Sequence, residues 1–193
     1  MRARAAAAAS LAAAGLALAS FGLWIPAKAA LAQLLLERAF DQSLKTGAPV
    51  KPWPWADTWP SARVSVPRLR RSAIVLEGAS GEAMAFGPGH LRASPEPGEA
   101  GTAVYAAHRD THFAFLGELR PDDLILVTRR DGRTFRFKVA EARIARWNAS
   151  GIDPRLGGRR LALTTCWPFG ALTHGPLRYI VTADLSGPPS RRR

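Results

Sequence analysis

Beyond Pro60, apolar and polar residues alternate with a period of two, and glycine, proline and aspartate repeatedly interrupt the alternation. A period of two puts every second side chain on one face of a strand, so each run predicts a short, half-buried β-strand. This succession of strands predicts an all-β barrel or sandwich. The predicted strands are Arg63–Pro67, Ala73–Leu76, Ala103–Ala107, Leu124–Thr128, Thr134–Arg146, Arg160–Cys166 and Leu177–Ala183.

The segment RRDGRTF contains the clearest turn signal in the chain. Asp131-Gly132 lies between two alternating runs, and Asp-Gly is a preferred pair for a two-residue hairpin turn. The runs on either side are therefore predicted to pair as antiparallel strands.

The N-terminus follows a different pattern, because residues 5–25 include no charged side chain. As a helix rising about 1.5 Å per residue, this run can cross the roughly 30 Å hydrocarbon core of a bilayer. Two arginines precede it, which favours a cytoplasmic N-terminus and export of the rest of the chain. A cleaved signal peptide is the alternative, since Ala27-Lys28-Ala29 has the form of a cleavage site. The length of the run and Trp24 near its end favour a retained transmembrane helix.

The segments next to the strand-rich region complete the predicted organisation. Apolar residues recur at near-helical spacing after Pro26 and predict an amphipathic stalk that ends at Thr46-Gly47. The prolines of KPWPWADTWP then predict an extended linker, whose tryptophans either pack on the domain or form a wall of a peptide groove. We therefore expect an anchor over 1–26, a stalk and linker over 27–60, a β-barrel domain over 61–185 and a basic, disordered tail over 186–193.

Composition narrows the classes of function. Apolar residues make up 47% of the 193 residues, which suffices for a folded core. The single cysteine, Cys166, excludes an internal disulfide framework and a cysteine-rich metal site, and leaves a thiol that is either buried and inert or reactive. The net charge of +12 would suit nucleic acid or an anionic membrane. We expect no nucleic-acid partner, because the basic residues are scattered and no nucleic-acid-binding motif accompanies them.

Three chemically active residues lie at predicted strand ends: His108 after TAVYAA, Cys166 at the end of RRLALTTC and Arg178 at the start of LRYIVTA. In an antiparallel pair the end of one strand lies beside the start of the next, so Cys166 and Arg178 are predicted neighbours. Nearby cationic groups favour the thiolate form of a thiol. Acyl transfer also needs a proton donor for the leaving amine and a donor to the oxyanion. Thiol, imidazole and guanidinium together can fill these roles.

The same segments resemble those of sortases. TAVYAAHRDTHFAFLGEL resembles the family's His-containing segment, LALTTC its Thr-Leu-x-Thr-Cys signature and GPLRYIV its Arg strand. The tryptophan-rich PWPWADTWP and TTCWPFG are similar to the class GN sortases of Gram-negative bacteria. The resemblance covers about residues 51–184 in matching order. It implies a closed mixed β-barrel of about seven to eight strands, here behind a predicted N-terminal transmembrane helix.

The resemblance also implies a membrane-anchored cysteine transpeptidase. Cys166 would attack the Thr carbonyl of a C-terminal Leu-Pro-x-Thr-Gly-like sorting signal in a target protein and form a thioester. His108 would be the general acid and base, and Arg178 would stabilise the oxyanion and the substrate backbone. An amine acceptor would then resolve the thioester. No cofactor and no metal are expected, and the catalytic domain would lie at the periplasmic face of the inner membrane.

Further residues are assigned to substrate binding. Ala162 replaces the first Thr of the family signature, which bears on substrate detail more than on the reaction class. Thr165, directly before the cysteine, is predicted to hold substrate through its side chain or backbone. Trp147, Ile152 and Leu156, in WNASGIDPRLGGRR, are predicted to meet apolar substrate residues. The alternative is that this segment is a surface loop with incidental apolar residues.

Several alternatives remain for these residues. His174, between Cys166 and Arg178, competes with His108 for the acid role. His112 would share a helix face with His108 as in a metal site, but HRDTH lacks the glutamate of a zincin. An L,D-transpeptidase also uses a cysteine with an earlier histidine, although in a Ser-x-Gly-Cys context, and the order of histidine and cysteine disfavours a papain-like protease. A membrane-anchored β module that binds an acidic partner is the non-enzymatic alternative.

Overall fold

The structure is a computed structural model that describes residue 15 and residues 30–171, 173 and 175–191. The seven predicted strands are all present, with ends that differ by a few residues. Two further strands, β3 and β9, have two residues each and are too short to show a period in the sequence. The strands are β1 (Pro60–Val66), β2 (Arg71–Glu77), β3 (Gly89–His90), β4 (Gly101–Ala106), β5 (Leu124–Arg129), β6 (Arg133–Arg146), β7 (Arg159–Trp167), β8 (Leu177–Leu185) and β9 (Ser190–Arg191).

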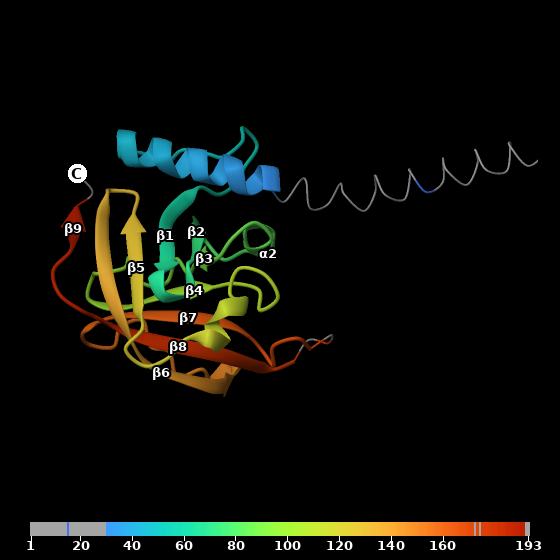
Figure 1. The fold of residues 1–193 in the computed structure, drawn as a ribbon, viewed down its shortest axis with the longest axis vertical. Helices are drawn as coiled ribbons and strands as arrows, with labels where there is room; N and C mark the ends of the chain where they lie inside the picture. The colour runs from blue at the N-terminus through green and yellow to red at the C-terminus, as the bar shows by residue number, and fades with distance from the viewer. Residues whose placement is uncertain (1–14, 16–29, 172, 174, 192–193) are drawn as a thin grey trace, which may run out of the picture.

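Eight of these strands form a closed barrel in the order β5-β1-β2-β3-β4-β7-β8-β6, and pairing of β5 with β6 closes it (Figure 1). The predicted closed mixed barrel is therefore confirmed. The β2–β3 and β4–β7 pairs are parallel, and the other barrel pairs are antiparallel. The parallel β4–β7 pair matters most for function, because it brings the ends of two distant segments to the same edge of the sheet.

The predicted hairpin joins β5 to β6. Thr128 pairs with Thr134, and Gly132 has a φ of 78°, a conformation that glycine adopts without strain. The Asp131 side chain accepts a hydrogen bond from the Arg133 amide at 3.0 Å, which closes the turn from inside. The alternating residues of this hairpin face the barrel interior. The most buried side chains in the core of the barrel include Val64, Tyr105, Phe113, Phe137, Leu161, Leu163 and Val181.

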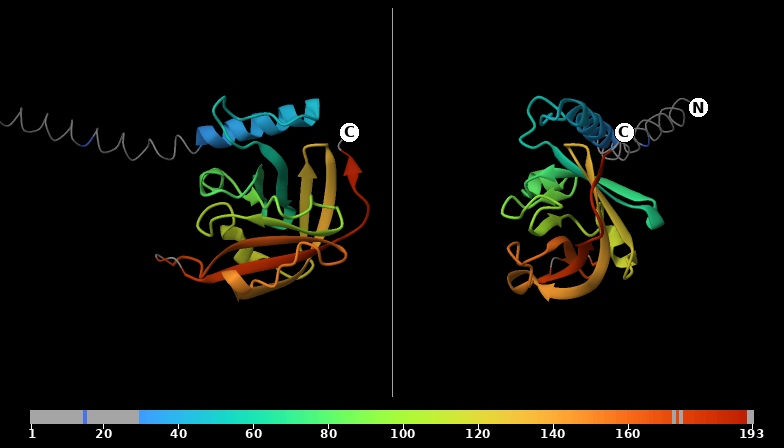
Figure 2. Two further views of the ribbon diagram at one scale, coloured as in Figure 1. Left: turned by 180° about the vertical axis from the view of Figure 1, so that it is seen from behind. Right: turned by 90° about the vertical axis from the view of Figure 1, so that its left-hand side faces the viewer.

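The predicted stalk is helical over residues 30–46 and packs on the barrel. Figures 1 and 2 show this helix lying across one end of the barrel, above β1 and the β5–β6 hairpin. Leu36 and Phe40 are fully buried against Ile74 and Leu76 of β2. Glu37 pairs with Arg63 of β1 at the edge of this contact. The helix is therefore part of the folded domain instead of a separate spacer.

No helix in the described part of the chain is both long and apolar enough to span a membrane. The predicted membrane span over 5–25 lies, apart from Gly15, outside the described residues.

The tryptophan-rich segment packs on the domain through one of its tryptophans, whereas a role as the wall of a peptide groove stays a prediction. Trp53 packs edge-on against Phe86 with 5.1 Å between the ring centroids, as a strap would. Trp55 is 82% exposed, and both tryptophans line an apolar cavity of about 940 Å³ that also contacts Thr111 and His112.

At the other end of the chain, the expected disordered tail contains an ordered part, because the two exposed residues of β9 pair with Arg133 and Thr134 of β6.

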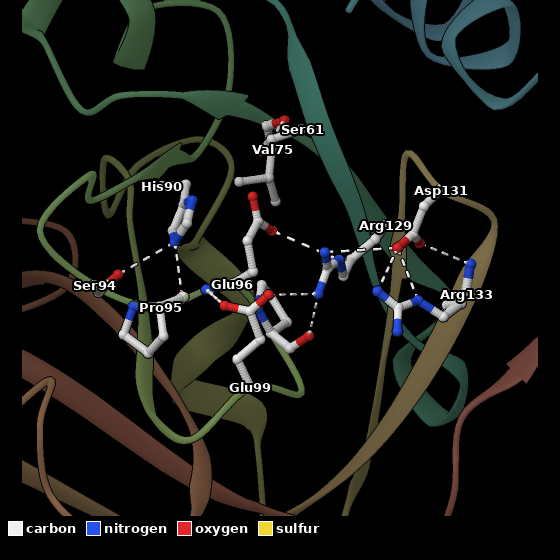
Figure 3. A network of polar contacts seen from close by, with 11 residues as sticks. Ser61, Val75, His90, Ser94, Pro95, Glu96, Glu99, Arg129, Asp131 and Arg133 are labelled. Atoms are coloured by element: carbon white, nitrogen blue, oxygen red, sulfur yellow. Dashed lines mark hydrogen bonds and ion pairs between the residues drawn. The ribbon is translucent and has the colours of Figure 1, made fainter. Parts of the chain in front are cut away.

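A network of ion pairs around Arg129 holds the connection between β3 and β4 (Figure 3). The largely buried guanidinium of Arg129 lies 3.8 Å from a carboxylate oxygen of Glu96, 3.4 Å from Glu99 and 3.5 Å from Asp131. Two carboxylates of the connection are thereby tied to β5 and its turn. This fixes the segment that leads directly into β4, the strand that precedes His108.

Candidate active site

Cys166 lies directly opposite Arg178 in the antiparallel register of β7 and β8. Residues that face each other in this way have Cβ atoms about 4.5–5.5 Å apart and project from the same face of the sheet. Both side chains are half-buried. The backbone pairing alone therefore puts a thiol beside a guanidinium.

The parallel register of β4 and β7 adds His108 to this pair. Ala106 is the partner of Thr164, and the Ala107 amide donates to the Thr164 carbonyl at 3.2 Å. β4 ends at Ala106, and if this register continued for two more residues, His108 would lie beside Cys166 on the same face. His108 is exposed to solvent. Cys166 and Arg178 thus face each other, and the parallel β4–β7 pair brings Ala106, two residues before His108, next to Thr164.

Alternation along β7 separates this face from the core. Leu161, Leu163 and Thr165 point into the core, whereas Thr164 and Cys166 point to the other side of the sheet. Thr165 is only 2% exposed, and its hydroxyl donates to the Ala107 carbonyl at 2.8 Å. This bond joins the residue before the cysteine to the residue before the histidine. The predicted substrate contact of Thr165 would therefore have to use its backbone.

Ala162, which replaces the first Thr of the signature, lies on the same face as the cysteine. It is fully buried between Val104 of β4 and Thr182 of β8 in the register. Ala162 therefore fills this position on the inner part of the sheet without a hydroxyl.

The turn after β4 is fixed by its own backbone and by buried aromatic side chains. The Phe113 amide donates to the His108 carbonyl at 3.2 Å, and Phe113 and Phe115 are buried in the core. The turn then continues into the short 3-10 helix η2 (Ala114–Glu118). Residues 109–112 form a turn and not a helix. His108 and His112 therefore do not share a helix face, as the two-histidine metal site would require.

His112 is nonetheless electrostatically coupled to His108. Burial of its ring lowers the pKa of His112, and the positive charge of His108 lowers it further. His112 is therefore harder to protonate than a free histidine.

The guanidinium of Arg178 is held by its own loop. Its Nη1 donates to the carbonyls of Gly175 at 3.0 Å and of Leu177 at 2.9 Å. Among the described residues, only Nη1 of this guanidinium makes hydrogen bonds, and a planar fork of this kind can also donate through Nε and Nη2 to an acyl oxygen. His174, the alternative acid, lies outside the described residues.

Aromatic packing anchors the strand ends around the cysteine. Trp167 stacks on Tyr179 with 5.5 Å between ring centroids, and Phe169 contacts both rings edge-on. Because Trp167 directly follows Cys166 and Tyr179 directly follows Arg178, this cluster fixes the backbone on which both functional side chains stand.

The residues predicted for substrate specificity lie on the connection between β6 and β7. Trp147, in the 3-10 helix η3 (Trp147–Ala149), and Leu156 are exposed, and Ile152 is half-buried. The Pro154 carbonyl accepts from the Thr102 amide at 3.0 Å, so this connection crosses the start of β4. Exposed apolar side chains here are available to a ligand. Their role in substrate binding stays a prediction.

Within the described residues, one group of side chains has ligand types and spacing suitable for a metal: Glu77, His90 and Glu96, whose ligand atoms lie within 4.8 Å of one another. Each carboxylate faces an arginine, Glu77 with Arg92 at 3.6 Å and Glu96 with Arg129 at 3.8 Å. The His90 Nε2 is within 3.1 Å of the Pro95 carbonyl (Figure 3). Protein groups therefore already balance the charge of this cluster.

Sequence reasoning assigned no role to Arg109, which directly follows the candidate histidine. Its side chain is 6% exposed, and its Nη2 donates to the carbonyls of Ala171 and Thr173, in the loop between Cys166 and Arg178. β4 ends at Ala106, so alternation could not show on which side this arginine lies. The only available signal was a charged residue next to the histidine.

The chain is similar to known proteins of one family. The family model for the sortase domain matches residues 64–186. Sortase D of Bacillus subtilis (strain 168) is 30% identical over 122 residues, which cover 63% of this chain and 61% of that protein. The matched part of the chain thus spans less than two thirds of this relative's length.

Solved structures share the fold. Sortase E from Streptomyces avermitilis superimposes with a TM-score of 0.57 at 30% identity, covering 67% of this chain and 90% of that one. The sortase D5 transpeptidase of Clostridium perfringens gives a TM-score of 0.64 at 21% identity, covering 82% of this chain and 99% of that one. The second likeness concerns the fold alone.

Proposed function

The chain belongs to the sortase family, and we propose that it is a membrane-anchored cysteine transpeptidase. It would cleave a Leu-Pro-x-Thr-Gly-like sorting signal near the C-terminus of a target protein and join that protein to an amine acceptor. The observation that carries this proposal is the pairing of β7 with both β8 and β4, which sets Cys166 opposite Arg178 and from which we infer that His108 lies beside Cys166. Members of this family are cysteine transpeptidases, and Cys166 is the chain's single cysteine.

In the first half of the reaction, the Cys166 thiolate attacks the carbonyl carbon of the scissile Thr–Gly bond. A C–S bond forms, and the carbonyl electrons move to oxygen, where Arg178 donates hydrogen bonds through the free side of its guanidinium. The C–N bond then breaks. His108, as imidazolium, gives its proton to the leaving Gly amine, and a thioester and a neutral imidazole remain.

In the second half, the acceptor amine attacks the thioester carbonyl. His108 accepts the proton that the amine loses as the new amide bond forms, and the thiolate leaves. The starting thiolate and imidazolium are thereby restored, so one peptide bond is exchanged for another with no net change in protons. Water in place of the amine would give hydrolysis by the same steps.

The exposed apolar side chains of Trp147 and Leu156 support a role for the β6–β7 connection in holding the signal's apolar residues. Ile152, half-buried on the same connection, would complete this contact. Thr165 would contribute through its backbone, since its hydroxyl is used by Ala107. No cofactor is required by these steps.

Within the family, we place the chain in class GN, and support comes from the tryptophan-rich segments PWPWADTWP and TTCWPFG. The relatives named above carry other class letters, so the placement rests on these segments. The uncharged run over 5–25 behind two arginines supports a single span of the inner membrane with a cytoplasmic N-terminus and a periplasmic barrel.

The proposal is tested by incubating the full chain, in detergent, with a fluorescent Leu-Pro-Glu-Thr-Gly peptide and an amine such as triglycine. We expect a transpeptidation product whose formation requires both substrates and is abolished in Cys166→Ala. Cleavage of a D-amino-acid stem peptide in place of the sorting peptide would support an L,D-transpeptidase. A folded protein that processes neither peptide would support the non-enzymatic alternative.

A further inference from the structure

We propose that Arg109 is a positioning residue of the acyl-transfer site, and that its buried guanidinium fixes the β7–β8 loop against the turn that carries His108. The chemistry that this positioning serves rests on the proposed function. We call the contact of Arg109 with the Ala171 and Thr173 carbonyls the clamp, and this contact does not depend on the reaction.

The clamp links two segments that are far apart in the chain. Nη2 of Arg109 donates to the Thr173 carbonyl at 2.9 Å and also to the Ala171 carbonyl. Both acceptors lie in the loop that begins after Cys166 and ends at Arg178. One side chain, placed directly after the candidate acid, therefore holds the loop that connects the nucleophile to the oxyanion donor.

The burial of this group is costly for the protein. The Arg109 side chain is 6% exposed, and its nearest carboxylate, Asp110, lies 3.5 Å away on a largely exposed side chain. Nη1 is buried and has no hydrogen-bond partner among the described residues. An unpaired buried donor costs roughly 1–3 kcal/mol, and an apolar side chain of similar volume often stabilises such a site equally well. The packing of the core therefore does not explain why this buried position is an arginine.

A second bond completes the arrangement from the other side. The Thr165 hydroxyl binds the Ala107 carbonyl, one residue before His108, whereas Arg109 binds the loop one residue after it. His108 is thus held between two cross-links to the chain segment that contains Cys166 and Arg178. Two flanking cross-links restrict the imidazole relative to the thiol more than either alone.

This position predicts a specific kinetic effect. A displacement of about 1 Å in a reacting group can lower the rate about 100-fold. Loss of the clamp should therefore reduce kcat, while KM for a peptide bound mainly through the β6–β7 connection changes little. Lysine can donate to the same carbonyls but lacks the planar fork, so it should restore part of the effect.

The test compares Arg109→Met, Arg109→Lys and Asp110→Asn in the full chain. Methionine fills the volume without donors, lysine restores donors, and Asp110→Asn removes the exposed carboxylate while leaving the clamp intact. We expect kcat to fall 10- to 100-fold in Arg109→Met, to recover at least threefold in Arg109→Lys and to stay unchanged in Asp110→Asn. Hydrogen–deuterium exchange at residues 171–177 should rise in Arg109→Met and remain low in Asp110→Asn.

The outcomes separate this inference from the proposed function. If the wild type transfers acyl groups and Arg109→Met keeps its kcat and loop protection, the positioning role is wrong and the proposed function stands. If Arg109→Met and Arg109→Lys lose equal activity with equal melting temperatures and unchanged loop exchange, the clamp is also wrong. If the wild type is inactive, the proposed function fails, and loop exchange alone decides whether Arg109 is the clamp.

Discussion

Cys166 and Arg178 face each other across the antiparallel pair of β7 and β8. The backbone register of the two strands sets the positions from which both side chains project, and the Gly175 carbonyl of the intervening loop further holds Nη1 of Arg178. The backbones that carry the thiol and the guanidinium are therefore paired before any substrate arrives. Preorganised donors of this kind are the ones that contribute most to oxyanion stabilisation.

Replacement of Arg178 by lysine should slow acyl transfer without unfolding the barrel. In Arg178, Nη1 binds the Gly175 and Leu177 carbonyls, and we assign Nε and Nη2 to the oxyanion. Lysine keeps the positive charge but lacks this second pair of planar donors. Loss of one oxyanion donor typically costs about 100- to 1,000-fold in kcat. Steady-state kinetics, with circular dichroism as the folding control, measures this effect. Wild-type kcat in Arg178→Lys would contradict the assigned role.

Alanine substitution should distinguish the histidines. His108→Ala removes the proton donor that we propose for the leaving amine and should lower kcat about 100- to 10,000-fold. His112→Ala should keep most of the activity, because burial and the charge of His108 make His112 harder to protonate. The comparison includes His174→Ala, since His174 is the rival for the acid role. Loss of activity in His174→Ala with retention in His108→Ala would reverse the assignment.

The packed N-terminal helix should contribute to the stability of the barrel. Phe40 is fully buried on Ile74 and Leu76, so Phe40→Ala should lower the free energy of unfolding by about 3 to 5 kcal/mol. Leu34 is exposed on the same helix, and Leu34→Ala should change it by less than about 0.5 kcal/mol. Chemical denaturation of both variants measures the difference. Equal effects would show that the helix does not pack as described.

Stability should also fall in acid through Asp123. The hydrogen bond from Arg68 is the main cause that lowers the pKa of Asp123, and the Arg120 amide also donates to this carboxylate. A lowered folded-state pKa stabilises the protein above the ordinary aspartate value of about 3.9. This contribution is lost as the pH falls through the folded-state pKa, because the unfolded chain binds the proton first.

Denaturation curves between pH 7 and pH 3 measure this dependence. Asp123→Asn should flatten the part of the stability profile below about pH 4. Its neighbour Asp122 is exposed and lies 3.8 Å from Lys138, so Asp122→Asn serves as the control and should leave the profile unchanged. The same acid slope in Asp123→Asn as in the wild type would exclude this carboxylate as its source.

Much of the barrel could be predicted from the sequence because period-two alternation follows directly from a half-buried sheet. Asp131-Gly132 similarly predicted the β5–β6 turn. The short strands β3 and β9 escaped prediction because two residues carry no period, and their pairing depends on distant partners. The helix over 30–46 was predicted, but its apolar stripe could not show that the barrel, instead of open solvent, lies beneath it.

The candidate site was likewise predictable from the sequence only in part. Chain order and strand ends were enough to predict that Cys166 and Arg178 are neighbours, since antiparallel pairing of consecutive strands requires it. The expected proximity of His108 rests on the parallel β4–β7 pair, which joins segments 58 residues apart at the Thr165–Ala107 bond. Alternation reveals no such pairing. The buried side of Arg109 was equally hidden, because the residue follows the end of β4.

The most direct test of the account is peptide mapping by mass spectrometry of the full chain after reaction with a Leu-Pro-Glu-Thr-Gly peptide in the absence of an acceptor amine. We predict a hydroxylamine-sensitive acyl mass on the fragment that contains Cys166, present in the wild type and absent from Cys166→Ala. Peptide cleavage by a folded Cys166→Ala variant, or an acyl group found on another residue, would contradict the account.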